Sequence, residues 1–225
     1  GPKFGENFNT GTAVIKPFLQ HRGIQKIDTL IVSHADNDHI GGAIPLINEV
    51  ETTTILSSTP ARLPNAIACI SGLSWQWNNV NFEILHPNSS DLGSENNLSC
   101  VLKVSNTRGS VLLSGDIEAE AEKHLVQRYR RDLQSTILIA PHHGSKTSSS
   151  LDFINAVSPD FALFPIGYRN RYHFPHNIVI KRYTDKGVNL LNTADHGAIE
   201  FKFTNDAIST PITWRQEKHK IWTTN

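Results

Sequence analysis

The segment Ser33–Gly42, which reads SHADNDHIGG, follows the apolar run DTLIVS and carries two histidines and two aspartates among six consecutive residues. The apolar run predicts a strand, and a tight turn at its end can direct alternating side chains towards two neighbouring points. Two carboxylates and two imidazoles gathered without a cation would lose hydration at a high cost. The turn therefore predicts a metal site in which His34 and Asp36 bind one ion and Asp38 and His39 bind another.

Other interpretations of this turn are weaker. A solvated acidic turn would not need a histidine at each end. A calcium-binding EF-hand loop that starts at Asp36 is excluded, because Ile40 and Ile47 occupy its fifth and twelfth positions, where oxygen ligands are required. The HExxH motif of zinc proteases is absent from the sequence.

A second apolar run ends in a carboxylate in Leu112–Asp116, LLSGD. One carboxylate can bridge two cations by giving one oxygen to each, and Asp116 is the candidate for this role. A Gly-Asp pair is also common in ordinary turns, so this signal gains its weight from the other motifs.

The loop Pro141–Ser150, PHHGSKTSSS, follows a third apolar run. One of its two histidines can complete the second metal site. The other histidine, together with Ser145, Lys146 and Ser148, can contact a phosphate. A helix N-cap at Ser148 or Ser149 is the structural alternative, and both interpretations can hold because helix N-termini also bind anions.

A fourth segment, Asn170–His176 (NRYHFPH), interleaves aromatic and basic residues and lies close to further arginines and lysines. This composition suits a phosphate backbone and the stacking of bases. A solvated loop anchored by its tyrosine is the alternative. The candidate substrate-binding residues of this segment are Asn170, Arg171, His173 and His176.

Length and composition indicate an ordinary globular chain of 225 residues with 21 basic and 21 acidic side chains. They predict a single domain over residues 1–225, whose core is large enough that a bound metal would be catalytic rather than structural. The balanced charge argues against an extended DNA-coating surface but leaves room for a cleft that handles one strand. Cys69 and Cys100 permit one disulfide, and no apolar run is long enough to span a membrane.

The pattern of apolar runs and amphipathic stretches predicts α/β layers with sheets inside and helices outside. The first helix should place Val14, Phe18 and Leu19 on one face. Several strands end in chemically capable residues, as expected where loops gather at the carboxyl edge of a sheet. Predicted helices cover 9–22, 43–49, 118–130, 150–157 and 178–186, and predicted strands cover 28–33, 52–57, 75–85, 98–105, 110–114, 136–140, 161–166, 190–193 and 199–203.

The order HxDxDH, GD and HHGS resembles the motifs of the metallo-β-lactamase superfamily. The resemblance extends to the C-terminal domain of the ComEC family of DNA-uptake channel proteins. It implies an αββα sandwich that lacks part of its first N-terminal β-hairpin and is the C-terminal fragment of a larger inner-membrane protein. It also implies a soluble domain on the periplasmic or extracytoplasmic face, with a cytoplasmic location as the alternative. The segments that carry it are SHADNDHIGG (33–42), ENNLSCVLKV (95–104), LLSGDIEAEAE (112–122), APHHGSKTSS (140–149), NRYHFPH (170–176) and NTADHGAI (192–199).

The same resemblance implies a metal-dependent phosphodiesterase that hydrolyses DNA and degrades the strand that is not imported during natural transformation. It implies two divalent ions, the first bound by His34 and Asp36 and the second by Asp38 and His39, with Asp116 between them. His142 is preferred over His143 as the last ligand, because it comes first after its strand. His143, His173 or His176 is then the candidate proton donor to the leaving oxygen, and Lys146 or Arg171 the candidate for neutralising phosphoryl charge.

The sequence departs from the superfamily pattern at two places. The expected third-motif histidine has no counterpart between Glu95 and Ser99, where Asn97 or Ser99 is the candidate replacement. Asp36 also stands where the superfamily has a histidine, and the resulting carboxylate-rich set predicts that manganese is favoured over zinc or magnesium.

Two other functions stay open at this point. One is a hydrolase of the same fold that acts on RNA, thioesters or lactones, and the other is a DNA-guiding module whose site has decayed. The histidines without ligand-type neighbours in the sequence are expected to be structural; they are His21, His86, His124, His196 and His219.

Overall fold

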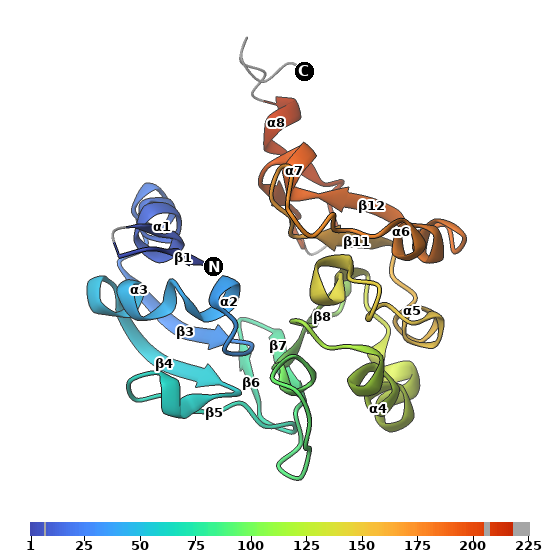
Figure 1. Cartoon of the computed structure of the whole chain (residues 1–225), viewed down its shortest axis with the longest axis horizontal. Coiled ribbons are helices and arrows are strands. Elements are labelled where there is room, and N and C mark those ends of the chain that lie inside the picture. The colour runs from blue at the N-terminus through green and yellow to red at the C-terminus, as the bar shows by residue number, and fades with distance from the viewer. Residues whose placement is uncertain (7, 205–207, 218–225) are drawn as a thin grey trace. The chain divides into compact units, whose positions relative to one another are not determined.

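The computed structural model describes residues 1–6, 8–204 and 208–217, and the chain divides into two compact units (Figure 1). Unit 1 comprises Gly1–Leu73 and Ile84–Val101, and unit 2 comprises Ser74–Glu83 and Leu102–Asn225. His219 lies outside the described residues. The prediction of one domain over residues 1–225 stays a prediction, and each unit is described by itself.

Unit 1 is built on a parallel three-stranded sheet in the order β3 (Lys26–Val32), β4 (Glu51–Ser57) and β5 (Ile67–Ala68). Parallel neighbours need a crossover connection, and the short α2 (Asn37–Ile40) and α3 (Ala43–Glu49) lie in the connection between β3 and β4. The metal-binding turn predicted from the sequence is the first part of this connection. Its position therefore follows from the sheet.

The core of unit 1 lies where α3 and the loop after β4 cover the sheet. Val32, Ala43, Ile55 and Leu63 form a buried cluster, and partly buried apolar side chains of neighbouring elements pack against it. The apolar ends of β3 and β4 are thus anchored at the point where the polar turn begins.

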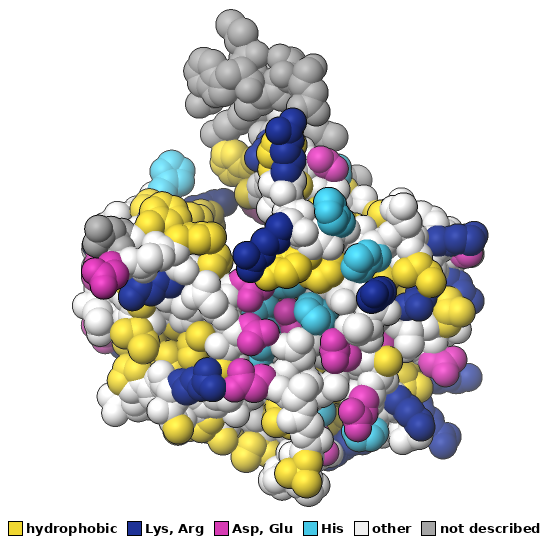
Figure 2. All heavy atoms as spheres, viewed as in Figure 1, with side chains coloured by type: hydrophobic (Ala, Val, Ile, Leu, Met, Phe, Trp, Pro, Cys, Tyr) yellow, Lys and Arg dark blue, Asp and Glu magenta, His cyan; other side chains and the backbone are white. Residues whose placement is uncertain are grey.

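The N-terminal segment has an exposed hydrophobic surface. It consists of the pair β1 (Lys3–Phe4) and β2 (Phe8–Asn9), the π-helical turn η1 (Gly11–Ile15) and α1 (Lys16–His21). The helix predicted over 9–22 is present in this form, but its apolar face is not buried: Val14 and Phe18 are 56% and 54% exposed. Figure 2 shows hydrophobic side chains on the surface in the region of α1.

The strand predicted over 98–105 is wrong at its start. Asn96–Leu98 forms the 3-10 turn η3, and β8 begins at Val101. The reason is local, because Ser99 and Cys100 make specific contacts of their own: the Ser99 hydroxyl meets His34, and the Cys100 amide donates to the Ser33 carbonyl at 2.9 Å.

Unit 2 is built on a seven-stranded sheet, whose strand β7 continues into unit 1 at Ile84 and whose strand β8 begins there. Strands β9 to β12 are parallel, whereas β8 pairs with β9 and β6 with β7 in antiparallel fashion. The parallel strands read as nearly continuous apolar runs because both of their faces are covered. The order is β12 (Asn189–Asn192), β11 (Phe161–Phe164), β10 (Ile137–Ile139), β9 (Gly109–Leu113), β8 (Val101–Asn106), β7 (Val80–His86) and β6 (Ser74–Trp77).

Three helices accompany this sheet: α4 (Ala119–Tyr129), α5 (Leu151–Val157) and α6 (Asn177–Thr184). They follow their predicted ranges closely, and their apolar sides are buried. Short 3-10 turns, η4 (Arg130–Leu133) and η5 (Pro141–Gly144), link the elements. The largest buried side chains of unit 2 include Phe153, Phe164, Leu112, Leu138 and Tyr183.

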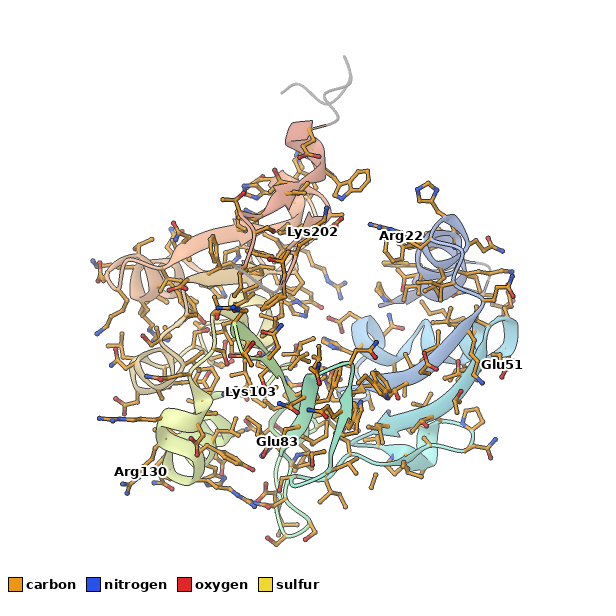
Figure 3. All side chains as sticks on the ribbon, turned by 180° about the vertical axis from the view of Figure 1, so that it is seen from behind. Arg22, Glu51, Glu83, Lys103, Arg130 and Lys202 are labelled. Carbon is orange, nitrogen blue, oxygen red and sulfur yellow. A yellow bond between two sulfur atoms is a disulfide. The ribbon has the colours of Figure 1, made fainter. Side chains whose placement is uncertain are left out.

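One cation is partly withdrawn from water on this sheet. Burial lowers the pKa of the Lys103 ammonium on β8, although Asp132 and Glu83 oppose the shift (Figure 3). Lys103 also donates a hydrogen bond to the carbonyl of Asp132. These contacts tie β8 to the turn after α4.

The C-terminal part of unit 2 contains α7 (Thr193–His196), β13 (Ile199–Glu200), β14 (Ile212–Thr213) and α8 (Trp214–Glu217). The strand predicted over 199–203 is wrong in length, because the Lys202 amide donates to the Ser209 hydroxyl instead of to a strand carbonyl. Within the described ranges, every helix falls short of the length and apolar character needed to cross a bilayer. The mixed α/β architecture predicted from the sequence is confirmed.

Candidate metal centre

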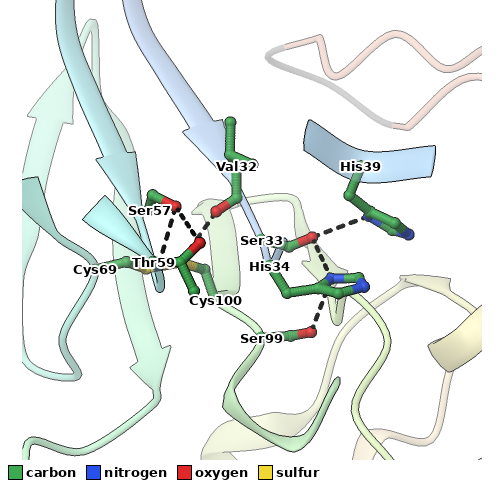
Figure 4. Close-up of a disulfide and its surroundings, with 9 residues drawn as sticks. All are labelled: Val32, Ser33, His34, His39, Ser57, Thr59, Cys69, Ser99 and Cys100. Carbon is green, nitrogen blue, oxygen red and sulfur yellow. Dashed lines mark hydrogen bonds between the residues drawn. A yellow bond between two sulfur atoms is a disulfide. The ribbon is translucent and has the colours of Figure 1, made fainter. Parts of the chain in front are cut away.

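The turn after β3 orients two imidazole rings in the same way. The Ser33 hydroxyl lies 3.1 Å from His34 Nδ1 and 3.0 Å from His39 Nδ1 (Figure 4). The opposite ring nitrogens meet carboxylates: His34 Nε2 lies 3.5 Å from Asp36 Oδ2, and His39 Nε2 lies 3.7 Å from Asp38 Oδ2. A ring held at one nitrogen and facing anionic oxygens with the other is the usual arrangement of a metal-binding histidine.

The two aspartates of this turn have half-exposed side chains. Asp36 occupies the N-cap position of α2, yet its side chain makes no capping hydrogen bond. Gly42 allows the turn to approach the N-terminal segment closely, because a Cβ at this position would lie 2.6 Å from the amide nitrogen of Gly11. The sequence pattern thus produces a compact loop in which the Asp36 carboxylate does not cap the helix that follows it.

Ser99 lies on the Nδ1 side of His34, with its hydroxyl 3.2 Å from that nitrogen. The residue predicted as a substitute metal ligand is therefore in contact with the ring of the candidate ligand His34. The neighbouring Cys100 forms a disulfide with Cys69, whose amide donates to the Ser57 carbonyl at 2.9 Å (Figure 4). The disulfide connects the segment just before β8, which carries Ser99, to the residue that follows β5.

Asn97, the other substitute predicted, takes part in a buried contact. Its carbonyl oxygen lies 2.6 Å from His86 Nε2, and His86 Nδ1 lies 3.3 Å from Asp91 Oδ2. Both nitrogens of His86 therefore have partners, as expected for a structural histidine.

In unit 2, the sheet register brings three chain segments to one edge. Leu113 of β9 pairs with Ile139 of β10, which also pairs with Leu163 of β11. Asp116 and His142 each follow three residues after a paired position, so they leave the sheet at the same edge. The His142 amide donates to the Gly115 carbonyl at 3.2 Å and joins the two loops.

The turn that carries both histidines has an unusual backbone. His142, His143 and Gly144 have φ values of 47°, 54° and 85°. Residues other than glycine rarely adopt these positive φ values. At Gly144 a side chain is excluded as well, because a Cβ would lie 2.6 Å from Pro175 Cβ. Strained backbone that persists at a loop of this kind is typical of a functional site.

The two histidines have different hydrogen-bonding partners. His143 Nδ1 lies 2.8 Å from the carbonyl oxygen of Pro165, which can accept a hydrogen bond from an Nδ1–H. His143 Nε2 lies 3.5 Å from Asp116 Oδ2. His142 places Nε2 at 3.9 Å from the same oxygen and the buried Nδ1 at 3.4 Å from Glu118 Oε1. The donor set of buried imidazole and carboxylate atoms fits a divalent cation.

The loop after the histidines is internally bonded. The Ser148 hydroxyl donates to the Pro141 carbonyl at 2.8 Å, and the Ser145 hydroxyl lies 2.9 Å from Thr147 Oγ1. Both serines are buried, whereas Lys146 is exposed. Of the three phosphate contacts predicted here, only the lysine projects from the loop. The predicted N-cap at Ser148 or Ser149 is wrong, because Ser150 accepts the Phe153 amide at the start of α5.

Sequence reasoning missed the residue that anchors this loop. The carboxylate of Glu122 on α4 is fully buried and accepts the amides of Ser149 and Ser150, the second at 2.8 Å. Burial raises the pKa of the Glu122 carboxyl, while these N–H donors and the nearby Arg182 oppose the shift. Glu122 falls on the apolar side of α4, which is the only sequence signal that could have indicated its burial.

Arg182 and Tyr183 of α6 complete this anchor. The Arg182 guanidinium donates to the carbonyls of Ser148 and Ser149 at 2.9 and 3.1 Å, and the Tyr183 hydroxyl donates to Ser149 Oγ at 3.1 Å. Burial raises the pKa of the Tyr183 phenol. A cleft of about 290 Å³ lies beside the loop, with Lys146 and Arg182 among its lining residues.

The segment predicted to contact substrate, residues 170–176, closes over the histidine turn. Asn170 uses its side chain internally, since Oδ1 accepts the Phe174 amide and Nδ2 donates to the Phe174 carbonyl, each at 2.8 Å. The His176 amide donates to the Gly144 carbonyl at 3.0 Å. Arg171 and His173 are exposed. Asn170 therefore shapes the loop, while Arg171 and His173 remain accessible.

Several known proteins are similar to this chain. It is 37% identical over 199 residues to competence protein ComA of Neisseria gonorrhoeae, covering 86% of this chain and 28% of that protein. It is 36% identical to recombination protein 2 of Haemophilus influenzae, over 86% of this chain and 24% of that protein. It is 31% identical to ComE operon protein 3 of Bacillus subtilis, over 88% and 27%. The chain thus spans about a quarter of the length of these curated relatives.

Solved structures agree with the fold. The metallo-β-lactamase fold protein YhfI of Bacillus subtilis matches with a TM-score of 0.50 and 14% identity, over 80% of each chain. CmlA, a diiron β-hydroxylase of Streptomyces venezuelae, matches with a TM-score of 0.51 and 10% identity, over 76% of this chain and 44% of that one. The family model described as metallo-β-lactamase superfamily matches residues 8–167, more than half of the chain. The chain therefore belongs to the metallo-β-lactamase superfamily.

Proposed function

We propose that this chain is a metal-dependent phosphodiesterase that hydrolyses DNA. The observation that carries the proposal is the presence of two turns with metal-ligand chemistry, one after β3 and one after β10, on a chain similar to a protein named competence protein ComA. We further propose that the ligands of both turns act together on two divalent ions. Such ions would supply Lewis-acid activation of water and of the phosphoryl group.

Six side chains would hold the ions. His34 and Asp36 serve the first ion, Asp38 and His39 serve the second, and Asp116 serves both. For the last ligand of the second ion we choose His143 over His142. Its Nδ1 lies 2.8 Å from the Pro165 carbonyl oxygen while its Nε2 faces Asp116, and a second contact of this kind orients metal-binding histidines.

His142 then has a different task. Its Nδ1 is buried 3.4 Å from Glu118 Oε1, so a carboxylate outside the proposed ligand set lies beside this ring. We assign His142 the proton that the leaving oxygen requires. Lys146 and Arg171 are exposed cations of the same unit and would neutralise charge on the phosphate.

The choice of metal follows from the chemistry of the proposed ligands. Three aspartates among the proposed ligands provide the oxygen-rich environment that manganese accepts more readily than a sulfur- or imidazole-rich site. We therefore propose that manganese supports activity better than zinc.

The Cys69–Cys100 disulfide supports an oxidising location, such as the extracytoplasmic side of a membrane, because such bonds are rare in the cytosol.

The proposed function is tested by cleavage of an end-labelled oligonucleotide with the purified chain and Mn²⁺. We expect Asp116→Asn and His39→Ala each to lower the rate by roughly 100-fold or more, since each removes a group that acts in the transition state. The matched controls are His124→Ala and Asp160→Asn, which change exposed residues away from both turns, and they should cut within about twofold of the wild type. Equal rates for the wild type, Asp116→Asn and His39→Ala would refute the assignment.

The choice between the two histidines has a test that does not depend on turnover. Titration of Mn²⁺ followed by calorimetry or by its paramagnetic resonance should show weaker binding for His143→Ala, by about 10- to 100-fold or more. His142→Ala should keep Mn²⁺ affinity and lose rate. Intact affinity in His143→Ala together with weak affinity in His142→Ala would reverse the assignment.

A further inference from the structure

Three rings in unit 2 form a stacked series that starts at the candidate metal ligand. The His143 ring lies 6.3 Å from the Phe174 ring at an interplanar angle of 14°, and Phe174 lies 5.5 Å from the Tyr172 ring at 21°. We call His143, Phe174 and Tyr172 the aromatic ladder. Its inner end belongs to the site, and its outer end is 55% exposed at Tyr172.

Hydrogen bonds within the loop fix the part of the chain that carries the aromatic ladder. Asn170 makes two hydrogen bonds with the backbone of Phe174, and the His176 amide is bonded to the Gly144 carbonyl. Phe174 is the middle ring and is half-buried. Tyr172 stacks on Phe174 from the exposed end of the series. A large aromatic ring held at the surface in this way is typical of a binding contact.

The outer end of the ladder also carries a cation. The Arg171 guanidinium lies 4.7 Å above the Tyr172 ring centre and donates to the Tyr172 hydroxyl at 2.6 Å. Proteins bind unpaired bases on aromatic faces and on arginine planes, and arginine also pairs with phosphates. Because the guanidinium lies over the ring, an incoming base displaces it from the ring face, and the arginine then pairs with the phosphate of the same nucleotide.

We propose that Tyr172 is a stacking platform for an unpaired base, and that the site consequently takes single-stranded nucleic acid. This inference rests on the proposed phosphodiesterase function. The rings of Phe174 and His143 lie between the platform and Asp116, whose Oδ2 is 3.5 Å from His143 Nε2, so the stacked base belongs to a nucleotide that flanks the cut phosphate. Bases paired in a duplex keep their faces covered by their neighbours and cannot stack on Tyr172 without being unstacked first.

The platform is tested by binding, with cleavage switched off. The probe is a fluorescent single-stranded DNA oligonucleotide in EDTA, measured by anisotropy with wild type, Tyr172→Ala and Tyr172→Phe. We expect Tyr172→Ala to weaken binding by roughly 5- to 150-fold and Tyr172→Phe to bind within about twofold, because stacking needs the ring and not the hydroxyl. Thermal unfolding should be unchanged in both variants.

Tyr168→Ala is the matched control. Tyr168 is an exposed tyrosine of the same loop with the Arg169 guanidinium 5.1 Å above its ring, but it is not one of the ladder rings. Its removal should alter binding by less than about threefold. A hairpin DNA that contains the same sequence as a duplex should bind the wild type more weakly than the single strand does. A single-stranded RNA whose affinity falls equally in Tyr172→Ala would also support the platform.

The outcomes separate the two proposals. Equal affinity of wild type and Tyr172→Ala for the single strand overturns the platform, whether or not the chain cuts DNA. Tyr172-dependent binding without cleavage in Mn²⁺ keeps the platform and overturns the phosphodiesterase. A loss in Tyr172→Phe as large as in Tyr172→Ala would assign the contact to the hydroxyl and would also overturn the platform.

Discussion

Replacing Glu122 by alanine tests whether a buried carboxylate holds the loop that follows the histidine turn. Glu122 is fully buried on α4 and accepts the backbone amides of Ser149 and Ser150. Arg182 reaches the same loop through the carbonyls of Ser148 and Ser149. The alanine variant removes the acceptor of two amides and the negative partner of a cation while leaving the helix itself intact.

The expected loss of stability follows from these contacts. A buried donor left without an acceptor costs about 1–3 kcal/mol, and the Ser150 amide is less deeply buried than that of Ser149. Adding the weakened environment of Arg182, we expect the free energy of unfolding to fall by about 2–4 kcal/mol. Because the loop joins the histidine turn to α5, Mn²⁺ affinity should fall as well.

Urea unfolding followed by tryptophan fluorescence measures the change. Glu120→Ala is the control, because Glu120 lies on the same helix but is exposed, and its removal should change the free energy by no more than about 0.5 kcal/mol. The reasoning would be refuted if Glu122→Ala unfolded at the same urea concentration as Glu120→Ala.

Three further predictions concern stability. Burial raises the folded-state pKa of Glu122 above its ordinary 4.5, so the native state binds this proton more tightly than the unfolded state does. The free energy of unfolding should therefore fall as the pH rises through the interval above 4.5. In urea titrations at a series of pH values, the wild type should lose free energy relative to Glu122→Gln, and a pH-independent difference between the two would contradict this. Replacing both Cys69 and Cys100 by alanine should cost about 3–4 kcal/mol in urea unfolding, since their separation of 31 residues sets the loop entropy, and unchanged stability would exclude the bond. Leu138→Ala, in the buried strand β10, should cost about 2–5 kcal/mol by calorimetric melting, against about 0.5 kcal/mol or less for Leu92→Ala, which is 92% exposed; similar losses would contradict the assignment of the core.

Most elements of unit 2 were predictable because their apolar runs have a clear period and sharp ends. Strands β9, β10 and β11 read as short apolar runs, and the polar residues after them mark the edge of the sheet. The strand predicted from residue 98 was wrong, because Ser99 looks like any strand residue until its hydroxyl is seen beside His34. Side-chain contacts between distant segments leave no local pattern.

The first helix shows that an apolar pattern alone does not predict burial. Its apolar spacing predicted a buried face, yet Val14 and Phe18 are exposed. Periodicity reports that a segment has an apolar face, but not whether the described residues cover it. The predicted pairing of cysteines was likewise open, since two thiols in a sequence do not reveal whether their Cα atoms approach; here they lie 6.0 Å apart.

The sequence by itself determined the α/β class, the superfamily motifs and the identity of the acidic and imidazole side chains, because these depend on residue type and on spacing along the chain. Only the tertiary structure decided that His143 Nδ1 is bound to the Pro165 carbonyl, that Glu122 anchors the loop and that Phe174 connects His143 to Tyr172. Those facts depend on strand register and on which groups are withdrawn from water. Both are set by packing between segments that are far apart in the sequence.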